Sequence, residues 1–181
     1  GDIREADDVN LFGDVDWIID AAANPSVLSG IEAGTSRPLM MQNLFGTING
    51  LEHAKNVQAG FTLLSSSRVY SIKDLSSLPM SSHSDYFSPD FESNQFAGLT
   101  CAGISETFST QAPISLYGAS KLASEVVCAE YSHSFDMPIY INRCGVLAGE
   151  GQFGRPDQGI FSFWLNAYKH QLNMRYIGFD G

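Results

Sequence analysis

Short apolar runs divide the chain and predict buried strands. Each run is four to six residues long, which is a usual strand length. Three alanines (Ala21, Ala22 and Ala23) follow the first run, which favours a strand that ends where another group must approach closely. The runs lie at residues 16–20, 60–65, 138–142 and 174–177.

Helical periodicity separates these runs. Apolar residues recur at steps of three and four over residues 38–55 and 116–134, which predicts helices that pack on a sheet. Another helix is expected at about 159–170. Over residues 71–111 the pattern changes to serine, proline, aspartate and glycine, which predicts a long irregular excursion. The alternation of strands and helices predicts an α/β fold with a mainly parallel sheet.

Composition narrows the class of protein. The chain has 181 residues, enough for one sizeable core, and a net charge of −10, which argues against nucleic acid or an anionic membrane as partner. Six of the seven acids in the first twenty residues, Asp20 among them, are expected to form a solvated face; Asp2 is the exception. The three cysteines and four histidines show no disulfide or metal spacing. A protein of the reducing cytoplasm, with no signal segment or membrane span, is expected.

Candidate chemistry gathers where the predicted strands end. Ligands of parallel sheets lie beyond the carboxyl ends of the strands. Residues 21–23, 65–67 and 144–149 follow the first three strands, so they are expected to border one crevice. Tyr117 would begin the helix beside that crevice. Lys121 follows four residues later, which puts a phenol and an ammonium on one helix face. Because a tyrosine ionises near pH 10, it needs a nearby cation to act as a base near pH 7.

Five motifs, in this order, resemble those of the extended short-chain dehydrogenase/reductases, in particular the NAD-dependent nucleotide-sugar epimerase and dehydratase family. They are residues 1–4, 20–23, 43–47 and 65–70, and the pair Tyr117 and Lys121. The resemblance covers essentially all of residues 1–181 and implies a Rossmann-like fold with NAD as cofactor and a nucleotide sugar as substrate. The chain would be the central part of one NAD-binding domain, in a possible homo-oligomer.

The resemblance also implies roles for individual residues. Ser66, four positions before Tyr70, would act with Tyr117 and Lys121 in catalysis. The cofactor would contact Asp2, Ile3, Ala21, Ala22, Ala23, Asn43, Tyr117, Lys121 and Cys144.

Residues 143–159 are most similar to the CDP-paratose 2-epimerase branch of this family, in which C2 of a CDP-linked 3,6-dideoxyhexose would be inverted. Gln152, Phe153 and Gln158 would contact the substrate. Two departures weaken any transfer of galactose-epimerase contacts: Val146 stands where many relatives have asparagine, and Asp20 where histidine is common.

Two other functions remain open. A dehydratase or decarboxylase would share the fold, but family dehydratases carry Asp-Glu where this chain has Ser67 and Arg68; Glu106 is another candidate acid. A non-catalytic nucleotide-sensing or interaction module is the second alternative, because no Gly-x-x-Gly-x-x-Gly turn precedes the motifs and the C-terminal substrate-capping region is missing. The isolated chain is therefore expected to bind dinucleotide poorly and to be poorly active.

Overall fold

The computed structural model describes residues 1–26, 30–31, 34–91, 96–154 and 159–174. Contacts divide the chain into two units, Gly1–Cys144 and Gly145–Gly181. The second unit contains α6 (Ile160–Lys169), as the periodicity predicted, whereas the strand expected at 174–177 lies almost wholly outside the described residues. That the whole chain belongs to one Rossmann-type domain stays a prediction.

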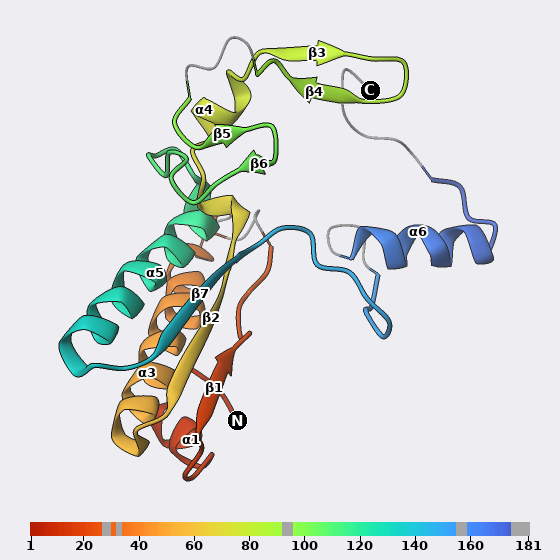
Figure 1. The fold of residues 1–181 in the computed structure, drawn as a ribbon. Helices are drawn as coiled ribbons and strands as arrows, with labels where there is room; N and C mark the ends of the chain where they lie inside the picture. The colour runs from red at the N-terminus through yellow and green to blue at the C-terminus, as the bar shows by residue number, and fades with distance from the viewer. Residues whose placement is uncertain (27–29, 32–33, 92–95, 155–158, 175–181) are drawn as a thin grey trace. The chain divides into compact units, whose positions relative to one another are not determined.

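Three parallel strands form the sheet of the first unit (Figure 1). They are β1 (Trp17–Asp20), β2 (Gly60–Ser66) and β7 (Ile139–Cys144), in the order β1-β2-β7. The register pairs Asp20 with Leu63 and Ser66 with Cys144. The predicted α/β class with a mainly parallel sheet is confirmed.

Two long helical stretches cover one face of this sheet (Figure 1). The first contains α2 (Ser36–Met40), a π-helical turn η1 (Met41–Phe45) and α3 (Gly46–Val57), and the second is α5 (Ser115–Phe135). The core lies between helices and sheet, where α3, β2 and α5 contribute Leu51, Phe61, Leu63 and Cys128, all fully buried. Apolar burial between these elements is what holds α5 over the strands.

The buried face of α5 is mostly polar, which the apolar periodicity did not predict. Val126, one of the residues that defined the expected helix, is 58% exposed. The buried positions instead recur at three- and four-residue steps and are Tyr117, Gly118, Ser120, Lys121, Ser124, Glu125 and Cys128. A helix that turns hydroxyl, amino and carboxyl groups toward a sheet needs partners for each of them, and this need builds the site described below.

The excursion at 71–111 is more ordered than predicted. It contains α4 (Ile72–Ser76) and two short antiparallel hairpins, β3–β4 (Met80–Ser82 and Phe87–Pro89) and β5–β6 (Leu99–Thr100 and Gly103–Ile104). Phe108 of the excursion packs with Val69 and Tyr70 in a small separate core. Strands of two and three residues are too short to show a period of two, so the sequence pattern misses them. The short helix α1 (Ala6–Asn10) is likewise absent from the predicted elements.

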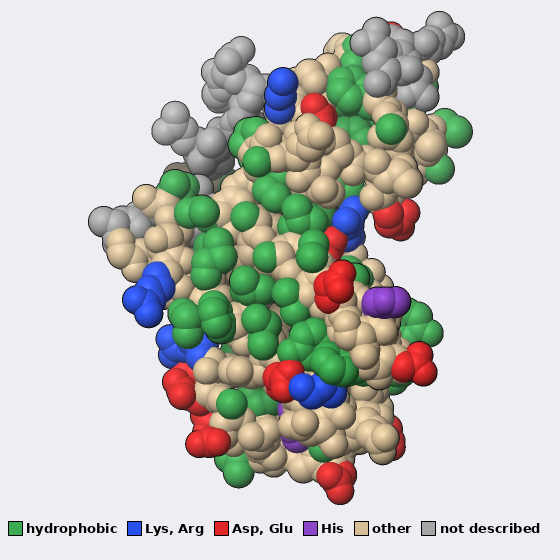
Figure 2. Space-filling model, turned by 90° about the vertical axis from the view of Figure 1, so that its left-hand side faces the viewer, with side chains coloured by type: hydrophobic (Ala, Val, Ile, Leu, Met, Phe, Trp, Pro, Cys, Tyr) green, Lys and Arg blue, Asp and Glu red, His purple; other side chains and the backbone are tan. Residues whose placement is uncertain are grey.

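The outer surface of the helical layer carries exposed apolar side chains. Figure 2 shows hydrophobic groups spread across the side of the molecule on which α5 lies. Leu116, Val126 and Phe135 of α5 are 40%, 58% and 49% exposed. Among the described residues, no helix combines the length and the apolar character that crossing a membrane requires.

One glycine sets how closely α5 approaches the end of β2. A Cβ at Gly118 would stand 2.3 Å from the Arg68 carbonyl oxygen in η2 (Ser67–Val69). Gly118→Ala should therefore lower the free energy of unfolding by about 1–3 kcal/mol, although alanine is the better helix former. Chemical denaturation measures this, with Gly145→Ala as control because no atom lies within 4 Å of its Cβ position. A stabilised Gly118→Ala protein would contradict the close packing.

Candidate active site

Lys121 is a buried amine that reaches from α5 to the carboxyl end of β2. Its side chain is 2% exposed, and Nζ donates a hydrogen bond to the Leu64 carbonyl oxygen at 3.0 Å. Burial lowers the pKa of Lys121, because taking an ammonium out of water disfavours the charged form. Tyr117, one helical turn earlier, is 9% exposed. The predicted phenol and amine thus face the sheet from the same side of α5.

Ser66 lies at the last position of β2, two residues beyond Leu64. Its Oγ accepts a hydrogen bond from the Arg68 amide at 3.1 Å and so caps η2, the element that Gly118 approaches. Contacts between α5 and η2, and between α5 and β2, bring Ser66, Tyr117 and Lys121 to one end of the sheet. Their catalytic roles stay a prediction.

Asn43 joins three segments from inside the π-helical turn. It is fully buried; its Oδ1 accepts a hydrogen bond from the Asn24 amide at 2.7 Å, and its Nδ2 donates to Ser120 Oγ at 3.1 Å. The Asn43 carbonyl accepts bonds from Thr47 at 2.9 Å and Ser124 at 3.3 Å. A π-helical turn changes which carbonyls are free, and such turns are frequent at functional sites. Asn43 therefore holds the segment after β1 and the helix α5 in place around the site.

A pocket of about 570 Å³ brings together several residues expected to bind the cofactor. Asp2 and Ile3 line it with Ala22, which lies two residues after the end of β1 and next to the exposed Ala21. Hydrogen bonds from Arg4 to the Asp2 carboxylate lower the pKa of Asp2 to about 2, so this side chain is an anion near neutral pH. Ala23 is half-buried. The small residues after β1 leave room beside this pocket.

The expectation that Asp20 is solvated is wrong. Asp20 ends β1 and is 4% exposed, with Oδ2 accepting a hydrogen bond from Thr47 Oγ1 at 2.7 Å and Oδ1 accepting one from the Ala22 amide at 3.0 Å. The other acids of the first twenty residues do not share this burial. A charge count along the sequence cannot detect a carboxylate that lies under the helical layer.

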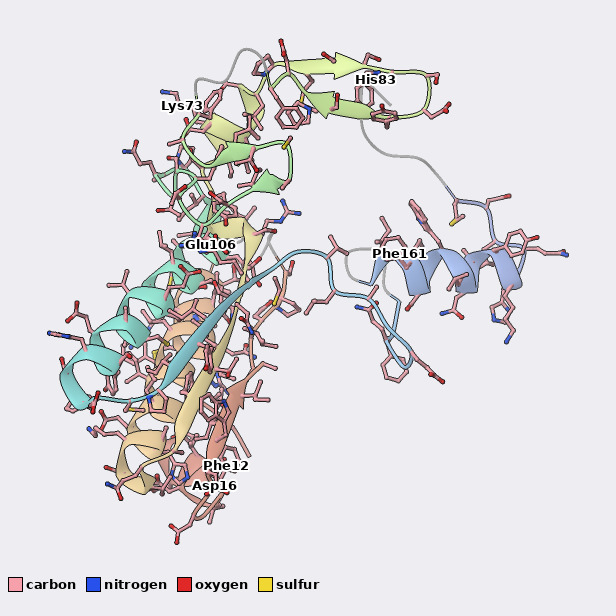
Figure 3. All side chains as sticks on the ribbon, in the orientation of Figure 1. Phe12, Asp16, Lys73, His83, Glu106 and Phe161 are labelled. Carbon is pink, nitrogen blue, oxygen red and sulfur yellow. The ribbon has the colours of Figure 1, made fainter. Side chains whose placement is uncertain are left out.

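A partly buried charge pair between Glu125 and Arg143 was not predicted. Glu125, one turn after Lys121, accepts hydrogen bonds from Arg143 Nη2 at 2.7 Å and from Ser65 Oγ at 2.5 Å. Arg143 also donates Nη1 to the Glu106 carbonyl at 3.0 Å and lies 5.2 Å from the centre of the Tyr70 ring. Figure 3 shows Glu106 beside the start of α5. The pair raises the pKa of Arg143 and joins β7, α5 and the excursion.

The remaining predicted site residues are divided between the first unit, the second unit and the part of the chain outside the described residues. Cys144 ends β7 opposite Ser66, so it belongs to the first unit and to the same end of the sheet. Gln152 and Phe153 belong to the second unit; Gln152 Nε2 donates to the Leu147 carbonyl at 3.1 Å, and Phe153 is 89% exposed. Gln158 lies outside the described residues. In the part of the chain that the structure describes, no His, Cys, Asp or Glu cluster could hold a metal ion.

The Arg143 pair yields a stability prediction. Arg143→Met should lower the free energy of unfolding by about 3–5 kcal/mol, because it leaves the Glu125 carboxylate buried without its cation. Arg143→Met combined with Glu125→Gln should recover part of the loss. Arg4→Met is the matched control: the side chains of Arg4 and Asp2 are 47% and 37% exposed, so stability should barely change. Equal effects of Arg143→Met and Arg4→Met, measured by urea unfolding, would contradict the assigned burial.

Solved structures share this fold. The structure of Pal from Bacillus thuringiensis is 21% identical with a TM-score of 0.68, over 94% of this chain and 46% of that one. UDP-glucose 4-epimerase from Thermotoga maritima with UDP-glucose is 14% identical with a TM-score of 0.67, over 98% and 50%. UDP-glucuronic acid 4-epimerase from Bacillus cereus with NAD is 24% identical with a TM-score of 0.61, over 95% and 45%. Identities this low show the fold alone, and the chain spans about half of each of these structures.

The family of this chain is shown by a match over its whole sequence. No curated protein matches the chain. The sequence model of the NAD dependent epimerase/dehydratase family matches this chain from residue 1 to residue 181. This agrees with the family and the NAD dependence that the five motifs predicted. The chain therefore belongs to the NAD dependent epimerase/dehydratase family.

Proposed function

We propose that the protein is an NAD-dependent epimerase of a nucleotide sugar. The observation that carries this proposal is the buried Lys121 amine, held on the Leu64 carbonyl beside Ser66 and one helical turn from Tyr117. A structural lysine would extend its ammonium to water, since this group is strongly hydrated. Family membership and the fold shared with two sugar-nucleotide 4-epimerases agree with the proposal.

The residues present suit a dinucleotide. An ammonium has three hydrogen-bond donors, and within the described residues Lys121 Nζ uses one, on Leu64. Two donors thus remain for the hydroxyls of the nicotinamide ribose. Asp2 and Ile3 would bind the adenosine half in the pocket that Ala22 also lines. The other cofactor contacts would come from Ala21 and Ala23 after β1, Asn43 of η1, Tyr117 of α5 and Cys144 at the end of β7.

The chain's own groups would move a proton. NAD, when bound, accepts a hydride from the sugar carbon and gives it back. Tyr117, as a phenolate, would take the proton of the hydroxyl on that carbon, so that the carbon becomes a ketone, and would return the proton when hydride is added to the opposite face. The Lys121 ammonium would stabilise the phenolate, and Ser66 would donate a hydrogen bond to the same sugar oxygen. The net result is inversion at one carbon with no net oxidation.

A finer assignment follows from residues 143–159, which resemble the CDP-paratose 2-epimerase branch. It would make the substrate a CDP-linked 3,6-dideoxyhexose and the inverted centre C2. Gln152, Phe153 and Gln158 would then contact the substrate. Incubation with CDP-, UDP- and dTDP-linked sugars, followed by product analysis, tests this assignment. Epimerisation of a different nucleotide sugar would contradict the CDP-paratose 2-epimerase assignment, whereas the proposal of a nucleotide-sugar epimerase would stand.

The two alternatives give different products. A dehydratase would release water, and its acid would have to come from a residue such as Glu106, whose backbone carbonyl accepts a hydrogen bond from Arg143. A nucleotide-sensing module would bind the ligand and leave it unchanged. Ser67 and Arg68, in place of the Asp-Glu pair of family dehydratases, favour epimerisation over dehydration.

Tyr117→Phe should abolish turnover in the full-length protein, which means a rate at least about 100-fold lower than that of the wild type. The general base is lost, while the ring and its packing remain. NAD binding, measured by calorimetry, should survive. Tyr140→Phe is the matched control, since Tyr140 is 65% exposed on the sheet and should keep the wild-type rate. A Tyr117→Phe protein with the wild-type rate would rule out the assigned base.

A further inference from the structure

The structure contains a buried carboxylate for which the proposed proton transfer gives no role. Asp20 is 4% exposed, and its two hydrogen-bond donors, Thr47 Oγ1 and the Ala22 amide, are both neutral. No ion pair within 4.0 Å involves Asp20 among the residues the structure describes. A buried anion held only by neutral groups is costly unless a positive charge lies nearby.

Lys121 is the nearby positive charge. Asp20 is opposite Leu63 in the β1–β2 register, and Lys121 Nζ is bound to the carbonyl of the next residue, Leu64. Neighbouring strands lie about 4.8 Å apart. The Asp20 carboxylate turns to the helical side of the sheet, where Thr47 of α3 binds it, and Lys121 enters from α5 on that same side. The two opposite charges therefore share one dry layer.

We propose that Asp20 is a positioning residue whose carboxylate is the counter-charge that keeps the Lys121 side chain an ammonium inside the buried site. This inference rests on the proposed function, in which that ammonium stabilises the Tyr117 phenolate and binds the cofactor ribose. Asp20 stands where histidine is common in similar sequences, and the proposal gives this difference a role.

Before Tyr117 loses its proton, neither Cys128 nor Glu125 supplies this charge. Cys128 lies on α5, as Lys121 does. Burial raises the pKa of its thiol to about 12, so Cys128 is uncharged near neutral pH. The Glu125 carboxylate is paired with Arg143. Burial lowers the pKa of Lys121, whereas the charge of Asp20 raises it and opposes that effect.

The test is a pH titration of the Lys121 side chain by NMR, in protein labelled with 13C at lysine Cε. The chain has only four lysines (Lys55, Lys73, Lys121 and Lys169), and the Lys121 signal is assigned by its loss in Lys121→Met. Asp20→Asn keeps the shape of the side chain and one acceptor oxygen for the Ala22 amide, and its Nδ2 can donate to Thr47 Oγ1, whereas the charge is removed. The Lys121 midpoint should move to lower pH by at least about one unit, because the ammonium loses its counter-charge.

Two variants separate the charge from a purely structural role. Asp16→Asn makes the same change of charge at the opposite end of β1, where Asp16 is exposed, and should leave the Lys121 midpoint unchanged (Figure 3). Thr47→Val removes a hydrogen bond to Asp20 but keeps the carboxylate; it should lower stability and move the midpoint less than Asp20→Asn. An Asp20→Asn midpoint equal to that of the wild type, or a shift no larger than that of Thr47→Val, overturns the proposal.

Activity gives an independent readout. Once turnover of a nucleotide sugar is measured, Asp20→Asn should shift the alkaline limb of the pH profile to lower pH, so that the rate at alkaline pH falls about tenfold for each unit of the shift. The NMR titration needs no substrate. Absence of turnover together with a shifted Lys121 midpoint would therefore refute the proposed function and keep the role of Asp20, whereas turnover with an unshifted midpoint would do the reverse.

Discussion

The hydrogen bond from Lys121 Nζ to the Leu64 carbonyl is the interaction on which the site depends. It brings an amine from a helix into the layer between helix and sheet, where water is excluded and every charge must be matched. The polar inner face of α5, the serines that bind Asn43 and the buried Asp20 lie in this same layer. The surrounding apolar core of Leu51, Phe61 and Leu63 supplies the burial that keeps the layer dry.

Two charge pairs serve different purposes at the end of this sheet. Arg143 and Glu125 are in direct contact, and they connect β7, α5 and the excursion by hydrogen bonds of ordinary length. Asp20 and Lys121 lie in the same dry layer without direct contact, and each binds neutral groups instead. A direct pair fixes geometry, because Arg143 binds Glu125 through both Nε and Nη2 and the Glu106 carbonyl through Nη1. A separated pair leaves the ammonium with donors for a ligand and still balances its charge.

The sequence predicted the parallel sheet and its covering helices because their signals are local. Apolar runs and helical periods are read within a few residues, and β1, β2, β7, α5 and α6 appear within about two residues of their predicted bounds. The ends of the strands then follow from topology, which is why Ser66, Tyr117 and Lys121 could be placed at one end of the sheet.

The missed features depend on contacts between distant residues. Arg143 and Glu125 are 18 positions apart, and Asp20 and Thr47 are 27 apart, so no local pattern shows their burial. The inward face of α5 was misjudged because hydroxyl and amino groups face the core and Val126 faces outward. A helix whose polar residues recur at the helical period is itself a signal of a site, and it was available in the sequence.

The central claim is that the buried Lys121 belongs to an NAD site. Calorimetric titration of NAD into the full-length protein and its Lys121→Met variant tests this most directly, with Lys73→Met, in the excursion, as control. The proposed site predicts that Lys121→Met weakens NAD binding at least about tenfold, the effect of about 1.4 kcal/mol from lost hydrogen bonds to the ribose, while Lys73→Met binds NAD like the wild type. Unchanged NAD affinity in Lys121→Met would contradict it.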